Sequence, residues 1–500
     1  MDQQRSGTSH LSIQELPLVV QDLFTLAHQE LLPEARRPPQ LFVRYLRRKA
    51  GRGLAVMYDA CEALPRRQRA AAAHRAISLT LDEQALTGSA IRVSPAQARN
   101  AVIEQSAAGL IQARDLGMAL AAFPADGGLP TLAECCDTSA GAQLLPALQE
   151  AAGLLLADGH WQIQTAQAMP IRYKPGSRCV IRYDLLLAHE REPSATRALS
   201  LFGKVYADPT QARRVQEVMQ LLYAEQLAST GLKQATPFLP RPLLLAAGPR
   251  LGLCAAVRPL RADGVLRTGT SVLVPRVLRQ AGGNSISPEL PADELRLAAL
   301  ALARLHTSQI RPGELAVRTG TKEAQRARER AGLLAGYYPA QAADIQDLVQ
   351  VLARHLETLR PPVYRPAHGG FKASQLLYHD GTVSVVDFDG FCLADPALDV
   401  GYFLAYLRPG GLWYGRQSMR AWFEAAGDLF LTTYVRALQE PGLSPQETTG
   451  IVQRAPLYAA ALLFKIATRR VNRLNSPRTQ ELAGMLNEIA SCLALTRRME

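Results

Sequence analysis

Apolar and polar residues alternate through residues 169–187, on both sides of a Lys-Pro-Gly-Ser sequence at 174–177. Alternation of this kind predicts a β-hairpin whose turn is the Pro-Gly segment. Residues 198–206 predict a further strand. Helical spacing over 209–226 follows Asp208, a residue type that favours the N-cap of a helix. We therefore expect three strands and then a helix in this part of the chain.

A similar pattern occurs earlier in the chain. Residues 40–59 predict two strands around a basic, Gly-containing turn, and residues 76–81 predict a third strand. A strand with a Pro/Gly loop at 117–132 and a helix at 140–156 complete this part. Its Arg/Tyr hairpin parallels the later hairpin, which favours an N-terminal α+β domain that echoes the later strands. A chance similarity between two Arg/Tyr hairpins explains the same pattern.

Helical spacing dominates the end of the chain. Residues 292–307 and 344–359 predict amphipathic helices, and residues 415–500 predict helices throughout, except at a Pro-Gly break at 441–442. Between these helices, residues 383–386 form a Val-rich strand after an Asp-Gly turn. Because strands come mostly first and helices afterwards, the fold class expected is α+β.

Composition places the chain among globular proteins with more than one domain. Its 500 residues exceed one ordinary core, and 48% are hydrophobic and 20% charged. The seven cysteines are scattered, without a Cys-x-x-Cys pair, which argues against a zinc site or a disulfide framework. The sequence shows no apolar run that could span a bilayer and no secretory leader. We therefore expect a reducing, cytoplasmic location without a membrane partner.

The formal net charge of +12 is compatible with anionic partners. The basic residues are spread along predicted helices, and neither a nucleic-acid-binding motif nor a basic run interleaved with aromatic residues is present. The sequence therefore disfavours nucleic acid as a partner and leaves small anionic substrates, including nucleotides, open.

Two carboxylates mark the candidate chemistry. The strand at 383–386 leads into Asp387 and Asp389, and a loop that begins at His368 precedes it. Carboxylates beside such a loop suit a magnesium-bound nucleotide better than zinc, because magnesium prefers oxygen ligands and keeps several waters. An acid bonded to nearby backbone at a strand end is the simpler alternative.

The order of His368, an amide at Gln375, a strand, Asp387-Phe388-Asp389 and the segment Ala394–Asp399 resembles the catalytic core of aminoglycoside phosphotransferases and choline-kinase-like enzymes. That family has the loop His-Gly-Asp-x-x-x-x-Asn, whereas this chain has Gly370 in place of the aspartate and Gln375 in place of the asparagine. The resemblance covers about residues 165–480. It implies a two-lobed, protein-kinase-like fold.

The resemblance also divides the chain into three parts. Residues 1–160 form an extra N-terminal α+β domain of unknown role, for which a degenerate copy of the nucleotide lobe is one interpretation and a chance similarity is the other. Residues 161–258 form the nucleotide-binding lobe, and residues 259–500 form the helical lobe with the catalytic loop.

Nucleotide-binding roles follow from the resemblance. Lys204 takes the place of the phosphate-binding lysine, and Glu217 is its expected ion-pair partner. The turn with Lys174, Gly176 and Ser177 could offer N–H groups to phosphates, although any surface hairpin uses similar residues.

Catalytic and metal-binding roles also follow from the resemblance. Asp387 and Gln375 are the expected Mg²⁺ ligands, Lys372 is expected to contact the transferred phosphate, and Asp389 could replace the base missing at Gly370. Three further residues are expected to support the loop: His368, Asp395 and Asp399.

The function implied is transfer of the ATP γ-phosphate to a hydroxyl of a small molecule, with weak or altered activity because of Gly370 and Gln375. The alternative is an inactive pseudokinase that binds nucleotide, or acts as a scaffold, and regulates a protein partner. If the basic segment with Lys465, Arg469, Arg470 and Arg473 borders the cleft, an anionic or neutral acceptor is favoured over an aminoglycoside; a solvated helix face explains the same residues.

Overall fold

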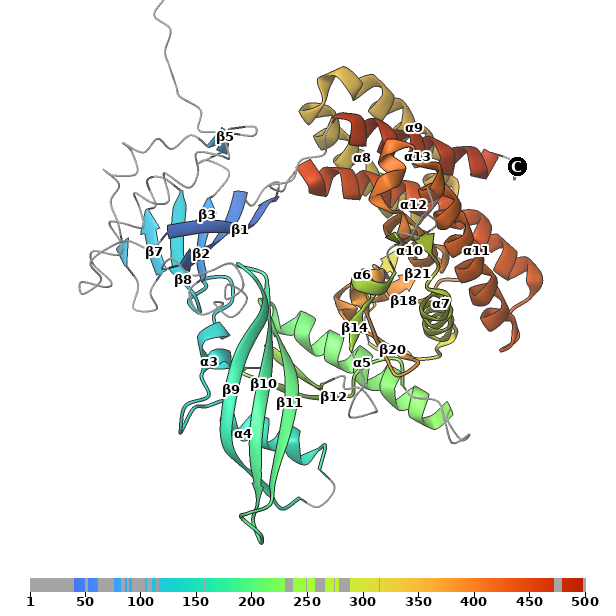
Figure 1. Cartoon of the computed structure of the whole chain (residues 1–500). Coiled ribbons are helices and arrows are strands. Elements are labelled where there is room, and N and C mark those ends of the chain that lie inside the picture. The colour runs from blue at the N-terminus through green and yellow to red at the C-terminus, as the bar shows by residue number, and fades with distance from the viewer. Residues whose placement is uncertain are drawn as a thin grey trace, which may run out of the picture. The chain divides into compact units, whose positions relative to one another are not determined.

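The computed structural model describes the chain most continuously from residue 117 onward (Figure 1). The described ranges are 40–49, 53–61, 76–81, short pieces between 86 and 115, 117–156, 159–229, 237–248, 250–256, 266–273, 275–277, 288–313, 315–471 and 479–497. Two compact units are present. The first contains residues 1–213 and 243–254, and the second contains most of the remainder.

The first unit contains two large sheets. The six-stranded sheet has the order β1 (Gln40–Lys49), β2 (Gly53–Cys61), β3 (Ala76–Leu81), β8 (Met118–Ala122), β7 (Leu110–Ala113) and β6 (Glu104–Gln105). The five-stranded sheet has the order β9 (Trp161–Lys174), β10 (Arg178–His189), β11 (Thr196–Tyr206), β13 (Leu251–Ala255) and β12 (Pro242–Ala246). A small hairpin, β4 (Leu86–Thr87) and β5 (Ala90–Ile91), is separate. The predicted hairpin at 169–187 and strand at 198–206 are confirmed as parts of β9, β10 and β11.

The two sheets share a strand order. Each begins with three consecutive antiparallel strands, and the third strand then pairs with the later of two consecutive strands, β8 after β7 and β13 after β12. In the six-stranded sheet, β6 adds one more strand beside β7. Tyr58 and Tyr183 are both fully buried on the middle strand of these three. Three residues before each tyrosine, the partners on the third strand are Thr80 and Lys204. We propose on this ground that the N-terminal domain is a degenerate copy of the nucleotide lobe, with threonine at the lysine position.

Two helices before residue 160 pack on the five-stranded sheet. α3 (Leu132–Cys136) and α4 (Leu145–Gly153) bury Leu132 and Leu148 in one apolar core with Ile181 and Leu201 of the strands. The side-chain amide of Gln149 also donates to the Trp161 carbonyl at 2.6 Å, which ties α4 to the start of β9. The core of this sheet therefore includes residues from both sides of position 160.

The second unit is mainly helical. Its long helices are α7 (Ala292–Thr307), α8 (Gly320–Tyr337), α9 (Ala342–Thr358), α10 (Ala397–Leu407), α11 (Gln417–Gln439), α12 (Pro445–Val471) and α13 (Thr479–Arg497), and α5 (Pro209–Ser229) continues into it from the first unit. The predicted helices at 292–307 and 344–359 are confirmed as α7 and α9. α12 packs against α8, α10 and α13, as Figure 1 shows. In the described chain, we find no helix with the length and hydropathy needed to cross a membrane.

Short elements of the second unit carry the candidate site. β19 (Leu376–His379) and β20 (Thr382–Val385) form the predicted hairpin and extend to β14 (Arg267–Thr268). A second small sheet joins β17 (Val317–Arg318), β21 (Cys392–Ala394) and β18 (Arg365–Ala367). The remaining short elements are α6 (Gly269–Val272), β15 (Arg276–Val277), β16 (Pro288–Glu289) and the 3₁₀ turns Pro339–Gln341, Ala373–Gln375, Phe388–Gly390 and Gly410–Tyr414.

Candidate functional site

Asp399 holds the loop that follows His368. Its carboxylate accepts the backbone N–H groups of Gly369, Gly370 and Phe371 at 3.3, 3.0 and 3.2 Å. Burial raises the pKa of this carboxyl, but the hydrogen bonding and charge of His306 outweigh burial, so the pKa lies below its ordinary value. A buried carboxylate that accepts several N–H bonds is stabilised as the anion. Asp399 therefore fixes the backbone at the position of the missing base.

The imidazole of His368 packs inside the loop. Its Nε2 lies 3.2 Å from the Val386 carbonyl, and its ring centroid lies 5.0 Å from that of Phe388. Burial lowers the pKa of His368, which favours the neutral ring. Arg318 braces the opposite side, because its guanidinium donates to the Gly369 carbonyl at 2.6 Å. The loop is thus bonded on both sides.

The two loop glycines differ in what they allow. Gly369 has φ +70°, and a Cβ there would collide with the carbonyl of Gly390. Gly370 has no left-handed φ, and a Cβ there would meet nothing within 4 Å. Residue 369 therefore requires glycine, whereas residue 370 has space and backbone geometry for a side chain.

Asp387 follows β20 in an uncommon backbone conformation. Its φ and ψ are 73° and 55°, in the left-handed region. This conformation costs an L-residue roughly 1–2 kcal/mol and persists where the surroundings impose it, often at functional sites. Asp389 lies in the 3₁₀ turn that follows and is half-buried. Both acids therefore leave the strand at one sharp turn.

Gln375 lies between the loop and Asp387. Its amide satisfies its neighbours when the nitrogen donates to the Gly370 carbonyl and the oxygen accepts from Lys372 Nζ at 2.9 Å. The amide end that faces Lys372 also lies 3.4 Å from Asp387 Oδ2. The Lys372 ammonium requires an acceptor at this end, so the oxygen lies here, and an amide oxygen and a carboxylate oxygen are side by side.

This oxygen pair fits a magnesium ion. Mg²⁺ is commonly held by one or two carboxylates together with substrate phosphates and water. Within the described ranges, no group of three His, Cys, Asp or Glu residues could hold a metal unaided. Asp387 and Gln375 would therefore hold the ion only with help from a bound ligand.

The turn predicted to cover phosphates is itself bonded. The Gly176 N–H donates to Asp126 Oδ2 at 2.8 Å, and the Tyr173 hydroxyl donates to the same oxygen at 2.7 Å. A Cβ on Gly128 would lie 2.6 Å from the Gly176 Cα, so the Asp126 loop approaches the turn closely. The Gly176 N–H thus has a carboxylate partner from the N-terminal side of the chain.

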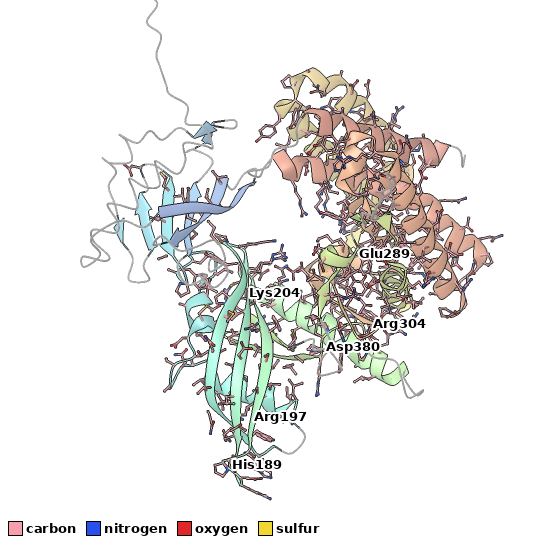
Figure 2. All side chains as sticks on the ribbon, in the orientation of Figure 1. His189, Arg197, Lys204, Glu289, Arg304 and Asp380 are labelled. Atoms are coloured by element: carbon pink, nitrogen blue, oxygen red, sulfur yellow. The ribbon has the colours of Figure 1, made fainter. Side chains whose placement is uncertain are left out.

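Lys204 lies near the end of β11, with its ammonium 5.3 Å from the Tyr206 ring centroid (Figure 2). Gly203 before it lets Leu251 and Tyr183 pack against the strand, since a Cβ would lie 2.7 Å from each. Glu217 of α5 accepts the Gly313 N–H at 3.1 Å. Lys204 belongs to the first unit and Glu217 to the second, and their pairing stays a prediction.

Glu225, the other acid of α5 that could face a lysine, bonds elsewhere within the second unit. Its carboxylate accepts from the Ser308 hydroxyl at 2.5 Å and from the Gln309 N–H at 2.6 Å.

Asp395, one of the residues expected to support the loop, is buried and accepts two hydrogen bonds from Arg454, at 2.7 and 3.0 Å. Asp395 therefore joins β21 to α12.

Asp126 and Arg318 carry no signal of their own in the sequence, and the place of His306 at the end of a predicted helix indicates only a core or capping histidine. His306 ends α7, where its Nδ1 lies 2.6 Å from the Tyr434 hydroxyl and its Nε2 lies 3.6 Å from Asp399 Oδ2. All three act through partners at least 47 residues away, such as Tyr173 for Asp126. The Pro/Gly loop around Asp126 indicated a turn without indicating its partner.

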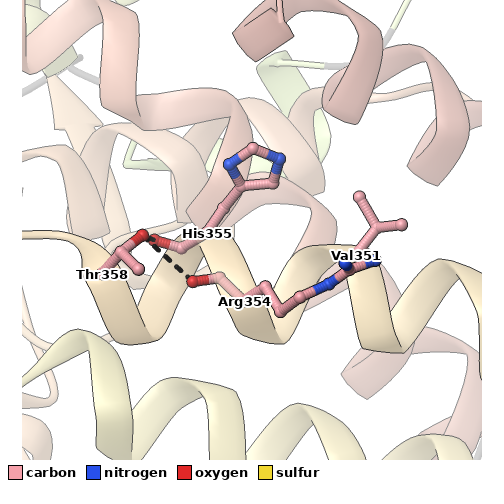
Figure 3. A pocket seen from close by; sticks show the side chains of 4 residues that line it. All are labelled: Val351, Arg354, His355 and Thr358. Carbon is pink, nitrogen blue, oxygen red and sulfur yellow. Dashed lines mark hydrogen bonds between the residues drawn. The ribbon is translucent and has the colours of Figure 1, made fainter.

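Helix α9 also lines a surface hollow, which contains none of the site residues described above. Val351, Arg354, His355 and Thr358 line about 290 Å³, and the Thr358 hydroxyl donates to the Arg354 carbonyl at 3.1 Å (Figure 3). None of the predicted site residues lines this hollow.

The model of the phosphotransferase enzyme family matches residues 195–446, which is half of the chain. A search of curated proteins found no significant match. Solved structures with low similarity include a glucosamine kinase, with 16% identity, 94% of this chain and 97% of that chain covered, and a TM-score of 0.40. A choline kinase from Cryptosporidium parvum has 11% identity, covers 71% and 95%, and has a TM-score of 0.42. A spectinomycin phosphotransferase in complex with ADP and spectinomycin has 11% identity, covers 67% and 93%, and has a TM-score of 0.38.

The matched residues include the strand of Lys204, the loop at His368 and the helix that contributes Asp399. The resemblance predicted from the sequence is confirmed at the level of the family, and so is the α+β fold class: the protein belongs to the phosphotransferase enzyme family.

Proposed function

We propose that the protein is a cytoplasmic phosphotransferase that moves the γ-phosphate of ATP to a hydroxyl of a small molecule, at a reduced rate. The observation that supports this most is the bonded loop: Asp399 and Arg318 hold the backbone of Gly369 and Gly370 in place although residue 370 has no side chain. The described cysteines are all free, which agrees with a reducing compartment.

Each residue of the candidate site has a separate role in this proposal. Asp387 and Gln375 would hold Mg²⁺, which when bound neutralises charge on the phosphates. Lys372, beside the Gln375 oxygen, supplies positive charge at the loop where the transferred group is expected. Lys204, paired with Glu217, would bind the other phosphates. Positioning and electrostatic stabilisation of this kind supply most of the catalysis in phosphoryl transfer.

The glycine at position 370 determines how fast phosphoryl transfer is expected to be, because it provides no general base. A positioned general base contributes about 10²–10⁴-fold, equivalent to roughly 3–5 kcal/mol of barrier. Asp389, one turn after Asp387, is the available carboxylate that could take the proton of the acceptor hydroxyl. Transfer is therefore expected to be slow and to depend on how the acceptor approaches Asp389.

A pseudokinase is the second candidate. It is favoured by the bonding of Gln375, whose amide is engaged by Lys372 and the Gly370 carbonyl instead of being open to a metal. Such a protein would bind nucleotide without transfer, or bind none, and would act through a protein partner.

Thermal unfolding with ATP, with and without Mg²⁺, tests the proposal. A ligand that binds only the native state at 100 times its Kd stabilises the protein by about 2.7 kcal/mol. We expect a magnesium-dependent rise in Tm that Asp387→Ala abolishes and that Asp347→Ala, an exposed acid on α9, leaves intact. ADP release with a panel of hydroxyl compounds then separates the candidates. Binding without any release selects the pseudokinase, and the absence of binding contradicts the phosphotransferase.

A further inference from the structure

Basic side chains gather around two tyrosines of α10 within the second unit. The Lys465 ammonium and the Arg318 guanidinium lie 5.3 and 5.5 Å from the centroid of the Tyr402 ring. One turn along α10, the Tyr406 hydroxyl accepts from Arg469 at 2.8 Å. These residues come from β17, α10 and α12, and α8 adds Arg330. We call Arg318, Arg330, Lys465 and Arg469 the basic cluster; Arg470 and Arg473 of the same sequence segment lie outside the described side chains.

The basic cluster has far more positive than negative charge. Glu323 is the carboxylate that faces it, and it is fully buried. This carboxylate already accepts from Arg318 at 2.8 and 3.0 Å, from Arg326 at 2.5 Å and from the Tyr402 hydroxyl at 3.3 Å. Burial would raise the pKa of Glu323, but Arg318 and Arg326 outweigh burial and keep the pKa low. Glu323 is therefore an anion whose bonding capacity is already used.

Three members of the basic cluster form no ion pair among the described side chains: Arg330, Lys465 and Arg469. The charge of Glu323 still acts on Arg330 and Lys465 from a greater distance. The Nη1 of Arg330 is buried and donates to no acceptor among the described residues. Burial, with repulsion from Arg469, Arg330 and Arg318, holds the pKa of Lys465 well below its ordinary value. Arg330 and Lys465 are half-buried. Partial burial of a cationic group without an ion-pair partner costs free energy, and a bound anion would reduce that cost.

The basic cluster is joined to the catalytic loop. Arg318 donates to the Gly369 carbonyl at 2.6 Å. Lys372 of the loop lies 5.6 Å from the centroid of the Tyr406 ring, whose hydroxyl Arg469 bonds. A group bound by the basic cluster would therefore lie beside residue 370, where the acceptor hydroxyl is expected.

We propose that the basic cluster binds an anionic group, a phosphate or a carboxylate, of the hydroxyl-bearing acceptor. This rests on the proposed function and names its substrate class: the acceptor is an anionic small molecule instead of a cationic drug. Guanidinium groups suit such a ligand, because they bind phosphate and carboxylate oxygens with paired hydrogen bonds. The phosphates of the nucleotide are the other source of the same chemistry.

Thermal unfolding with inorganic phosphate and without nucleotide tests this site, with chloride at equal ionic strength as the reference. We expect phosphate to raise the Tm of the wild-type protein. Lys465→Met and Arg330→Gln should each weaken the affinity for phosphate by roughly ten- to hundredfold, as expected for the loss of one charge-assisted hydrogen bond. The affinity is read from the phosphate concentration that is needed to raise the Tm. Without phosphate, both variants should keep or raise the wild-type Tm, because each removes a half-buried cationic group that has no ion-pair partner. Arg304→Gln, at the exposed Arg304 of α7 (Figure 2), should match the wild type in both conditions.

Asp387→Ala distinguishes the two sources of phosphate. This variant should keep the full response to inorganic phosphate while losing the response to ATP and Mg²⁺. The inference is overturned if Asp387→Ala loses the phosphate response, if Lys465→Met and Arg330→Gln keep it, or if both lower the Tm without phosphate. A wild-type protein that responds to ATP and Mg²⁺ but not to phosphate also overturns the inference and leaves the proposed function standing.

Discussion

Restoring a carboxylate at residue 370 is the most direct perturbation of the loop. Gly370→Asp should fold, because a Cβ there meets nothing within 4 Å and the backbone is not left-handed. Replacing glycine at a compatible position also reduces the entropy of the unfolded chain, which stabilises a protein by about 0.4–1 kcal/mol. The Tm of Gly370→Asp should therefore equal or exceed that of the wild type.

Gly369→Asp is the matched control in the same loop. Its φ of +70° alone costs roughly 1–2 kcal/mol for a side chain. The collision with the Gly390 carbonyl adds to this cost and moves the N–H that Asp399 accepts. We expect a clear fall in Tm for Gly369→Asp, measured beside Gly370→Asp in the same buffer.

The catalytic effect follows from the same geometry. If the new carboxylate acts as the base, turnover of ATP with an accepted hydroxyl compound should rise by about 10²–10⁴-fold. ADP release by the wild type and Gly370→Asp, with a range of anionic and neutral hydroxyl compounds and with water alone, measures this. The reasoning is refuted if Gly370→Asp is folded and binds ATP yet releases ADP no faster than the wild type with any acceptor.

Two further predictions concern the supports of the site. Asp399→Asn should lower the free energy of unfolding by about 3–5 kcal/mol, since it removes a buried charge from three N–H groups. Because the folded pKa of Asp399 is lowered, this stability is present above the unfolded pKa of about 4 and is lost as the pH falls through the folded value. Denaturant unfolding at several pH values should show the two proteins converging in acid, and a constant difference would contradict this origin. Asp126→Ala should speed amide hydrogen exchange at Gly176 and lower the Tm, since about 1–2 kcal/mol of bonding to Gly176 and Tyr173 is lost; unchanged exchange would show that the turn does not need Asp126.

Local pattern was enough to predict the regular elements near the site. The hairpin around residues 174–177 and the helix α7 were predictable because alternation and helical spacing are properties of neighbouring residues. Asp399 and Gln375 could be proposed through resemblance to a family. The bonds of Asp126 could not, since they depend on a turn 50 residues later in the chain.

The basic cluster was harder to predict from the sequence than the hairpin or α7. Tyr402 and Tyr406 are four residues apart on α10, and Lys465 and Arg469 are four residues apart on α12, so each pair occupies one helix face. Matching spacings predict a contact only when the two helices are known to pack together. The excess of positive charge also depends on Arg330, which lies more than 130 residues before Lys465 in the sequence. The sequence alone therefore does not show that these cations lie close together.

The packing of α3 and α4 on the five-stranded sheet bears on how this protein can be divided in evolution and in the laboratory. A truncation at residue 160 would strip Leu132 and Leu148 from the strand residues that they cover and leave apolar surface open to aggregation. Limited proteolysis should spare this junction for the same reason. The residues before position 160 therefore cannot be removed without damage, because they supply part of the hydrophobic core of the sheet that carries Lys204. Recombination at that point would yield two fragments, each with an incomplete core.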